Sequence, residues 1–272
     1  MAMEFLQIKR EALQYYKMAA DKGDAESILS YALMFYKGDG IPVNKKEAAS
    51  YFKKSADLGN EKAMFNYALM LINGEGIPTN EREAVRYYKM SADKEYVDAM
   101  HNYALLCYDG RGCEKNDKEA VIYFKKAADK GCEMSMYNYA KMCYSGDGTA
   151  VNKKEAAIYF KKAADKGHVD AKYNYALMND NGDGIPTNKK EAAIYYKMSA
   201  DKGEVNAMFN YALNCYNGDG IPVNKKEAAI YFKKAADKGN EIAMYNYALM
   251  SNKGNGIPVN KKEAVHYYKI LI

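Results

Sequence analysis

Few residues in this sequence can carry chemistry. It has no Trp, and its 272 residues include only five Cys, five Pro and three His. The histidines His101, His168 and His266 are 67 and 98 residues apart, and no Cys belongs to a C-x-x-C pair or to another spacing typical of a metal site. We therefore expect no catalytic residue, no metal, no cofactor and no enzymatic activity.

Long apolar segments are missing as well. No run approaches the roughly 18 apolar residues that a membrane-spanning helix needs, so we expect no membrane insertion. The first residues, MAMEFLQIKREALQYY, lack the apolar core and the cleavage site of a signal peptide. An odd number of Cys without a pairing pattern is typical of free thiols in a reducing compartment. Together these features predict a cytoplasmic protein.

The sequence shows no strong excess of one charge. Forty Lys and Arg stand beside 35 Asp and Glu, which gives a net charge of +5. Paired lysines such as Lys45 and Lys46 recur, but acidic residues such as Glu47 are interleaved with them, which is typical of a solvated face. We expect no nucleic-acid partner, and a basic stripe for nucleic acid or anionic lipid is the alternative interpretation.

What the sequence does have is one unit repeated many times. The pair Glu-Ala recurs every 36 residues from Glu11 to Glu263, without an insertion. Such a period is the signature of a solenoid built from near-identical supersecondary units. The aromatic residues at constant positions, Tyr67 and Tyr87 among them, are expected in the core.

Each unit reads as two helices. In the unit at 60–95, Ala63, Tyr67 and Leu71 have the spacing of one helix face, and Pro78 in the following G-x-G-I-P loop prevents the helix from continuing. Asn80 then precedes Glu83 by three residues, which is an Asn version of the capping box of a second helix. Most units end in Asp-Lys-Gly, where Gly can stop the helix. We count seven first helices and eight second helices.

These motifs resemble the Sel1-like repeat family, a branch of the tetratricopeptide-like solenoids. The resemblance rests on the small residue at Ala63, the G-x-G-I-P loop at 74–78, the K/R-x-E-A start of the second helix and Y-Y/F-K-x-x-A near its end. It implies an all-α, right-handed superhelical solenoid of 36-residue helix-turn-helix repeats, with about fifteen antiparallel helices. The expected domain is a single one over residues 1–272, with seven full repeats plus a half repeat.

A polar residue recurs inside the apolar first helices. Asn66 lies about 100° around its helix from the centre of the buried stripe, and the resemblance implies that this face lines the concave surface of the solenoid. The residues at this position are Asn66, Asn102, Asn138, Asn174, Asn210 and Asn246. An Asn side chain can pair with both polar groups of a peptide unit, so this ladder predicts that an extended peptide binds in the groove.

Specificity would come from the neighbours of the ladder. The expected neighbours are the aromatic row Phe65, His101, Tyr137, Tyr173, Phe209 and Tyr245, the tyrosines Tyr36, Tyr108, Tyr144 and Tyr216, and Lys141. The predicted function is that of a protein–protein interaction adaptor or scaffold, with a protein or peptide as its partner. In a second interpretation, the asparagines bridge adjacent first helices by hydrogen bonds.

Two further alternatives concern other surfaces. The protein would be a structural solenoid whose partner docks on its outer or terminal surface. Alternatively, the residues that end the sequence, Ile270, Leu271 and Ile272, would let the solenoid self-associate as a homo-oligomer, because solenoid ends need a polar cap. Among the remaining residues, Cys107, Cys143 and Cys215 are expected to be small core residues, and His168 is expected to be solvated.

Overall fold

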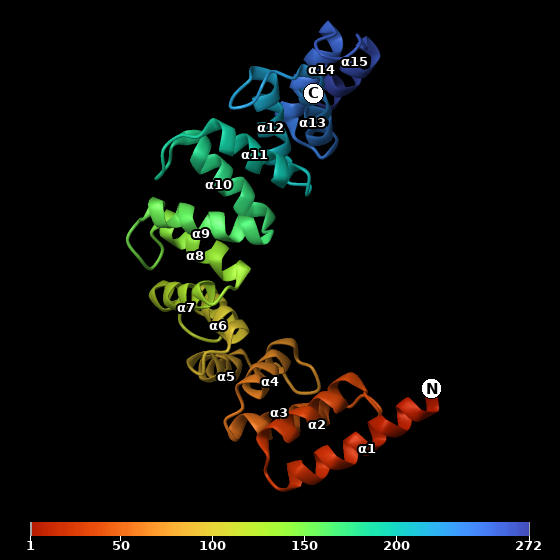
Figure 1. Cartoon of the computed structure of the whole chain (residues 1–272). Helices are drawn as coiled ribbons and strands as arrows, with labels where there is room; N and C mark the ends of the chain where they lie inside the picture. Colours follow the sequence, from red (N-terminus) through yellow and green to blue (C-terminus); the bar gives the residue numbers. More distant parts are fainter. Residues whose placement is uncertain (1, 272) are drawn as a thin grey trace. The chain divides into compact units, whose positions relative to one another are not determined.

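The computed structural model describes residues 2–271, with side chains from residue 11 onward (Figure 1). Within that range it contains fifteen α-helices and no strand. The helices are α1 Ala2–Asp21, α2 Ala25–Lys37, α3 Lys45–Asp57, α4 Glu61–Asn73, α5 Glu81–Asp93, α6 Val97–Asp109, α7 Asp117–Asp129, α8 Glu133–Ser145, α9 Lys153–Lys166, α10 Val169–Asn181, α11 Lys189–Ala200, α12 Val205–Asn217, α13 Lys225–Asp237, α14 Glu241–Lys253 and α15 Lys261–Ile270. The prediction of an all-α solenoid of helix hairpins is confirmed.

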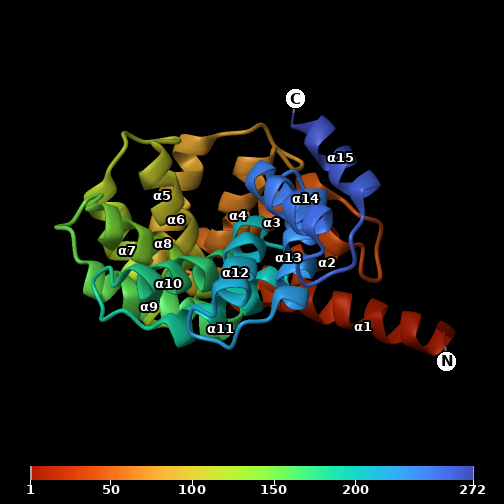
Figure 2. The same cartoon turned by 90° about the horizontal axis from the view of Figure 1, so that it is seen from above.

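The chain forms two compact units. Unit 1 comprises the residues up to Ser135 together with Asp147–Thr149, and unit 2 comprises Met136–Gly146 and the residues from Ala150 onward. In each unit the even-numbered helices are first helices and the odd-numbered ones are second helices. Within each unit, helices that follow one another in sequence pack together, as α12 does on α13 and α13 on α14 (Figure 2). No helix among the described residues is long and apolar enough to cross a membrane.

The predicted cap begins every second helix from α3 to α15. In α7, Asn116 Oδ1 accepts a hydrogen bond from the backbone N–H of Glu119 at 3.1 Å, and Asn116 Nδ2 lies 3.5 Å from the Glu119 carboxylate. The same carboxylate accepts from the Tyr103 hydroxyl at 2.8 Å and from Lys89 Nζ, in the preceding repeat, at 3.1 Å. The hydrogen bond from Tyr103 contributes most to lowering the pKa of Glu119. The recurring Glu therefore ties together a cap, a first helix and the preceding repeat.

A second group of bonds joins successive second helices. The Tyr87 hydroxyl donates to Asp57 at 2.8 Å, and Lys53 Nζ lies 2.9 Å from Asp57 and 3.2 Å from the Tyr87 oxygen. Tyr87 is buried, as predicted, with its hydroxyl at the edge of the core. Comparable groups are Lys89, Asp93 and Tyr123; Lys161, Asp165 and Tyr195; and Lys197, Asp201 and Tyr231. The Lys53-type lysines thus join repeats instead of being simply solvated.

The second Gly of the G-x-G loop sits against the backbone of the preceding repeat. Gly76 has φ +74°, and a Cβ placed there would lie 2.4 Å from the carbonyl carbon of Lys45. At Gly220 the corresponding distance to Lys189 is 2.2 Å. Consecutive repeats approach this closely because glycine is present at these positions.

One prediction about a side chain is wrong. His168 is only 9% exposed and is the N-cap residue of α10, where its ring nitrogen Nδ1 accepts from the Ala171 N–H at 3.3 Å. The ring is buried because Tyr137, from the preceding first helix, stacks on it with the ring centroids 4.3 Å apart. The prediction that Cys107, Cys143 and Cys215 are core residues is confirmed, since all three are buried.

Candidate functional site

The six asparagines of the predicted ladder are half-buried on the first helices, Asn66 and Asn102 in unit 1 and the other four in unit 2. Three of them bond back to their own helix: the Nδ2 groups of Asn66, Asn174 and Asn246 donate to the carbonyl four residues earlier at 2.8, 2.9 and 2.8 Å. Each of these three amides retains its oxygen and one N–H for another partner.

Several amides also meet tyrosine hydroxyls. Burial raises the pKa of Tyr137, and a hydrogen bond with Asn174 in the next repeat offsets part of that rise. Burial likewise raises the pKa of Tyr173, and a hydrogen bond with Asn210 offsets part of that rise. In unit 1, burial raises the pKa of Tyr88 to about 12 against an opposing hydrogen bond with Asn102. The amides of Asn102, Asn174 and Asn210 therefore lie close to tyrosines of other helices, and both interpretations of the ladder stay predictions.

The aromatic row beside the ladder leans on the second helices. Ring centroids lie 5.6 Å apart for Phe65 and Tyr88, and 5.9 Å apart for Phe209 and Phe232. The remaining contacts of this kind are His101 on Phe124, Tyr137 on Phe160, Tyr173 on Tyr196 and Tyr245 on Tyr268. Five of the six side chains are half-buried, whereas Tyr245 is 53% exposed.

The tyrosines near the ends of the first helices contact charged residues. Tyr144 donates to Asp183 at 2.5 Å, and its ring lies 5.0 Å from Lys153 Nζ. In unit 1, Lys45 Nζ lies 3.0 Å from the centroid of Tyr36, and Lys115 Nζ lies 5.2 Å from that of Tyr108. Tyr216 differs, because its hydroxyl accepts a hydrogen bond from the neutral Asn255 at 2.8 Å.

A hollow of about 360 Å³ lies beside Tyr216 in unit 2, among α12, α13 and α14, which lie side by side (Figures 1 and 2). Its apolar wall consists of Leu213, Phe232, Leu249 and Met250. Its polar wall consists of Tyr216, Asn217, Asn246, Lys253 and Asn255. This hollow brings together two residues that the sequence predicted, Asn246 and Tyr216, with apolar surface and one cation.

The other residues of the hollow were missed at the level of sequence. Their signal was available, because Lys253 stands where the two preceding repeats have Asn217 and Asn181, and Asn255 stands where they have Asp219 and Asp183. Positions that depart from the repeat therefore indicate this hollow better than the recurring asparagines of the ladder do.

The remaining predicted residues lie apart from the hollow. Lys141 is exposed, and its Nζ lies 5.6 Å from the centroid of Tyr137. Ile270 is 53% exposed and Leu271 is half-buried, whereas Ile272 lies outside the described residues. Among residues 11–271 no group of three His, Cys, Asp or Glu side chains is arranged to hold a metal ion.

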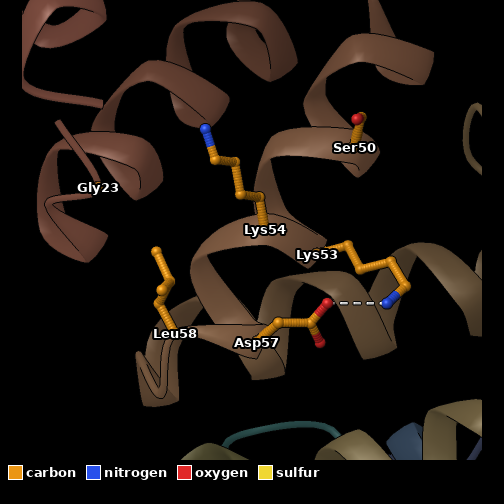
Figure 3. A pocket seen from close by; sticks show the side chains of 6 residues that line it. All are labelled: Gly23, Ser50, Lys53, Lys54, Asp57 and Leu58. Atoms are coloured by element: carbon orange, nitrogen blue, oxygen red, sulfur yellow. Dashed lines mark hydrogen bonds and ion pairs between the residues drawn. The ribbon is translucent and has the colours of Figure 1, made fainter. Parts of the chain in front are cut away.

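A different hollow, of about 440 Å³, lies at the end of α3 in unit 1. Figure 3 shows Lys53 bonded to Asp57 across it, while Lys54 points away from that pair. Unit 2 has a similar hollow of about 480 Å³ that includes Asp201, Lys234 and Asp237. Because Lys53 and Asp57 already bond to Tyr87, and Asp201 bonds to Tyr231, we assign these hollows to repeat stacking.

The Sel1 repeat model matches residues 9–24, 25–60, 61–96, 97–132, 134–168, 169–204, 205–240 and 242–271. The chain belongs to the Sel1 repeat family. Proteins of this family are in general scaffolds that bind other proteins, and not enzymes.

Two solved structures support the assignment of the Sel1 fold. One is a protective antigen of uropathogenic Escherichia coli strains that displays an SLR fold, with 25% identity and a TM-score of 0.86 over 95% of this chain and 56% of that one. The chain therefore spans little more than half the length of that protein. The other is a Sel1 repeat protein from Oxalobacter formigenes, with 25% identity and a TM-score of 0.72 over 96% of this chain and 76% of that one. No curated protein matches the sequence.

Proposed function

We propose that this protein is a scaffold that holds an extended segment of a partner protein on the first-helix face of unit 2, along α10, α12 and α14. The observation that carries the proposal is the hollow among α12, α13 and α14, because it combines apolar walls, amides and a cation in one cavity. Ligand sites typically have this mixture of apolar lining and a few convergent polar groups.

The free energies of the available contacts favour a segment that is held mainly in the hollow over one that is held equally by every asparagine. A hydrogen bond to one amide contributes about 1 kcal/mol net, and ordering the segment costs a comparable amount for each immobilised side chain. Burying one large apolar side chain contributes about 1.5–3 kcal/mol. The hollow therefore supplies more affinity than any one rung, and the amides of Asn174 and Asn210 fix the direction and register of the segment.

A second candidate function uses the outer face of unit 2. Ile158, Ile194 and Ile230 are 48%, 48% and 45% exposed at equivalent positions of α9, α11 and α13. Each has an exposed Lys four residues before it, namely Lys154, Lys190 and Lys226. Residues at this spacing are neighbours on a helix surface, so this row suits a partner surface that is apolar at its centre and acidic at its edges.

The test is selection from a library of random octapeptides with free C-termini, followed by calorimetric titration of the best binders. The informative variant is Asn174→Ala/Asn210→Ala/Asn246→Ala. The control is Lys166→Ala/Lys202→Ala, because both lysines are exposed residues of the same unit that lie at or just after the ends of second helices, outside α10, α12 and α14. Helicity and melting temperature are compared for all three proteins.

We expect the affinity of the triple variant for the peptides to fall at least about tenfold, which corresponds to the loss of one or more hydrogen bonds between neutral groups. The control should bind like the wild type. Equal binding by all three proteins would overturn the proposal. If binding instead depends on Ile158, Ile194 and Ile230, the outer face is the site. A triple variant that melts well below the control would show that the amides act chiefly in stacking.

A further inference from the structure

A lysine that starts a second helix usually has a carboxylate partner: Lys45 pairs with Glu75, Lys153 with Asp183 and Lys189 with Asp180. In unit 2, Asp183 accepts hydrogen bonds from the Tyr144 hydroxyl at 2.5 Å and from Lys153 Nζ at 2.7 Å. In unit 1, Glu75 lies 3.0 Å from Lys45 Nζ in the same arrangement. The loop carboxylate thus neutralises a lysine that starts the preceding second helix.

The last loop of this kind lacks its carboxylate. Position 255, which follows Asp183 by two repeats of 36 residues, is Asn. Lys225 stands 30 residues before it, as Lys153 stands 30 residues before Asp183. Lys225 Nζ lies 5.5 Å from the centroid of Tyr216, and it has no carboxylate partner among residues 11–271. One positive charge is therefore left without its usual counterion.

A second lysine adds to this excess of positive charge. Lys253 lines the hollow and, within the described part of the chain, forms no ion pair. A lysine in the last turn of a helix is favourable for the helix dipole, yet the equivalent helices α10 and α12 end in Asn181 and Asn217. Dipole compensation is therefore not a requirement of this position, and Lys253 adds a cation where α10 and α12 have a neutral Asn.

We propose that the hollow binds the C-terminal residue of a partner protein, with its carboxylate on Lys225, Lys253 and the Tyr216 hydroxyl. The bound carboxylate supplies Lys225 with the counterion that Asp183 supplies to Lys153. Its apolar side chain packs on Leu213 and Leu249. This inference rests on the proposed function and names the part of the bound segment that enters the hollow.

A chain terminus fits the hollow better than an internal acidic residue does. The C-terminal residue presents a carboxylate and a side chain from the same Cα, so one residue satisfies both the cations and the apolar wall of Leu213, Phe232, Leu249 and Met250. An internal Asp or Glu would bring a polar side chain against that wall and leave it without an apolar partner. The volume of about 360 Å³ is at the small end of ligand pockets, which suits one residue.

The experiment uses random octapeptides that end in Leu, Ile, Phe or Met, prepared once with free carboxylates and once as C-terminal amides. Binders to the immobilised full chain are identified by mass spectrometry and titrated by fluorescence polarisation. The variants are Lys253→Asn and Asn255→Asp, which restore the residues that the chain itself uses at 217 and 219. Lys226→Asn is the matched control, because Lys226 is exposed, carries the same charge and lies outside the hollow.

We expect amidation of the peptide C-terminus to weaken binding at least about tenfold. Lys253→Asn and Asn255→Asp should each weaken binding of the free-carboxylate peptides about tenfold, as expected for the loss of a hydrogen bond to a charged group. Lys226→Asn should bind like the wild type. Equal binding of the amides, or binding that requires an internal Asp or Glu, would overturn the inference. If the amidated peptides bind as well as the free-carboxylate peptides and binding still needs Asn174 and Asn210, the proposed function is supported and this inference is wrong. If no peptide of either pool binds, both proposals fail together.

Discussion

Units 1 and 2 share their internal bonding and differ in charge. The Lys53, Asp57 and Tyr87 group of unit 1 has the same geometry as the Lys161, Asp165 and Tyr195 group of unit 2. Unit 1 contains 20 Lys and Arg and 22 Asp and Glu, whereas unit 2 contains 20 Lys and 13 Asp and Glu. The net charges are therefore −2 and +7. The net charge of the whole chain, +5, hides this difference.

The difference separates stacking from recognition. Bonds that recur in both units keep successive repeats in register, so they say little about a partner. Two of the nine charges in this difference come from departures within unit 2, at Asn255, where a carboxylate is lost, and at Lys253, where a cation is gained. A partner with a negative group should therefore prefer unit 2, because charge complementarity adds to selectivity and association rate.

The largest expected effect tests the part that the units share. Gly76→Ala in unit 1 and Gly220→Ala in unit 2 would each place a Cβ within 2.4 Å of the preceding repeat's backbone at positive φ. We expect each variant to lose about 3 kcal/mol of unfolding free energy, since overpacking and left-handed strain add. Urea unfolding followed by circular dichroism measures this.

Gly203→Ala is the control for the glycine variants. Gly203 also has positive φ, but nothing lies within 4 Å of a Cβ placed there. Its loss should be about 1 kcal/mol, the cost of the left-handed conformation alone. A loss at Gly76 or Gly220 no larger than the loss at Gly203 would show that the close approach of the repeats carries no energetic weight.

The next effect tests whether the tyrosine bonds are equivalent in the two units. Tyr87→Phe and Tyr195→Phe each remove a hydroxyl that bonds to an Asp of the preceding repeat. We expect each to lose about 1 kcal/mol at pH 7, the net contribution of a hydrogen bond. Unequal losses would break the comparison, because they would show that stacking differs between the units.

The same variants have a pH signature. The hydrogen bonds from Lys53 and Tyr87 lower the pKa of Asp57, and for Asp165 burial would raise the pKa but the bonds from Tyr195 and Lys161 outweigh it. A carboxyl with a lowered folded-state pKa stabilises the fold above its unfolded pKa of about 4 and stops doing so as pH falls through the lower folded value. The losses caused by Tyr87→Phe and Tyr195→Phe should therefore shrink in acid; losses that stay constant down to pH 2 would refute this assignment.

The sequence predicted the fold more completely than the site. A period of 36 residues, the Asn80 cap and the glycine loops each have local causes, so features such as the start of α5 directly after Asn80 followed from the sequence. The partners of Tyr87 and Glu119 lie one repeat away and depend on the stagger between helices, which local patterns do not contain. His168 was misjudged for the same reason, since the Tyr137 ring that covers it belongs to the preceding first helix. The hollow at Lys253 needed both the stagger and the comparison of repeats.

A smaller effect concerns an ion pair whose charges are reversed between the units. Lys153 pairs with Asp183 in unit 2, whereas Glu81 pairs with Arg111 at the equivalent positions of unit 1. Arg111→Glu should cost about 1 kcal/mol, the upper range for an exposed pair that becomes a repulsion. Adding Glu81→Lys should restore most of it. A double variant no more stable than Arg111→Glu alone would show that the pair contributes through packing and not through charge.

The smallest effect isolates one residue in which unit 1 departs from unit 2. Glu95 has φ +67°, the one non-Gly residue with positive φ in the described chain, and it stands where unit 2 has Gly239 with φ +94°. Its ion pair with Lys130 is 73% exposed on the Glu side and contributes little. Glu95→Gly should therefore gain about 0.5–1 kcal/mol, because relief of left-handed strain exceeds the added freedom of the unfolded chain. Gly239→Glu should lose a similar amount, because it introduces the same left-handed strain. No clash adds to that strain, since no atom lies within 4 Å of a Cβ placed at that position. Thermal unfolding measures the stability change caused by each of the two variants. Changes of the same sign would mean that the left-handed backbone conformation at this position does not determine the effect on protein stability.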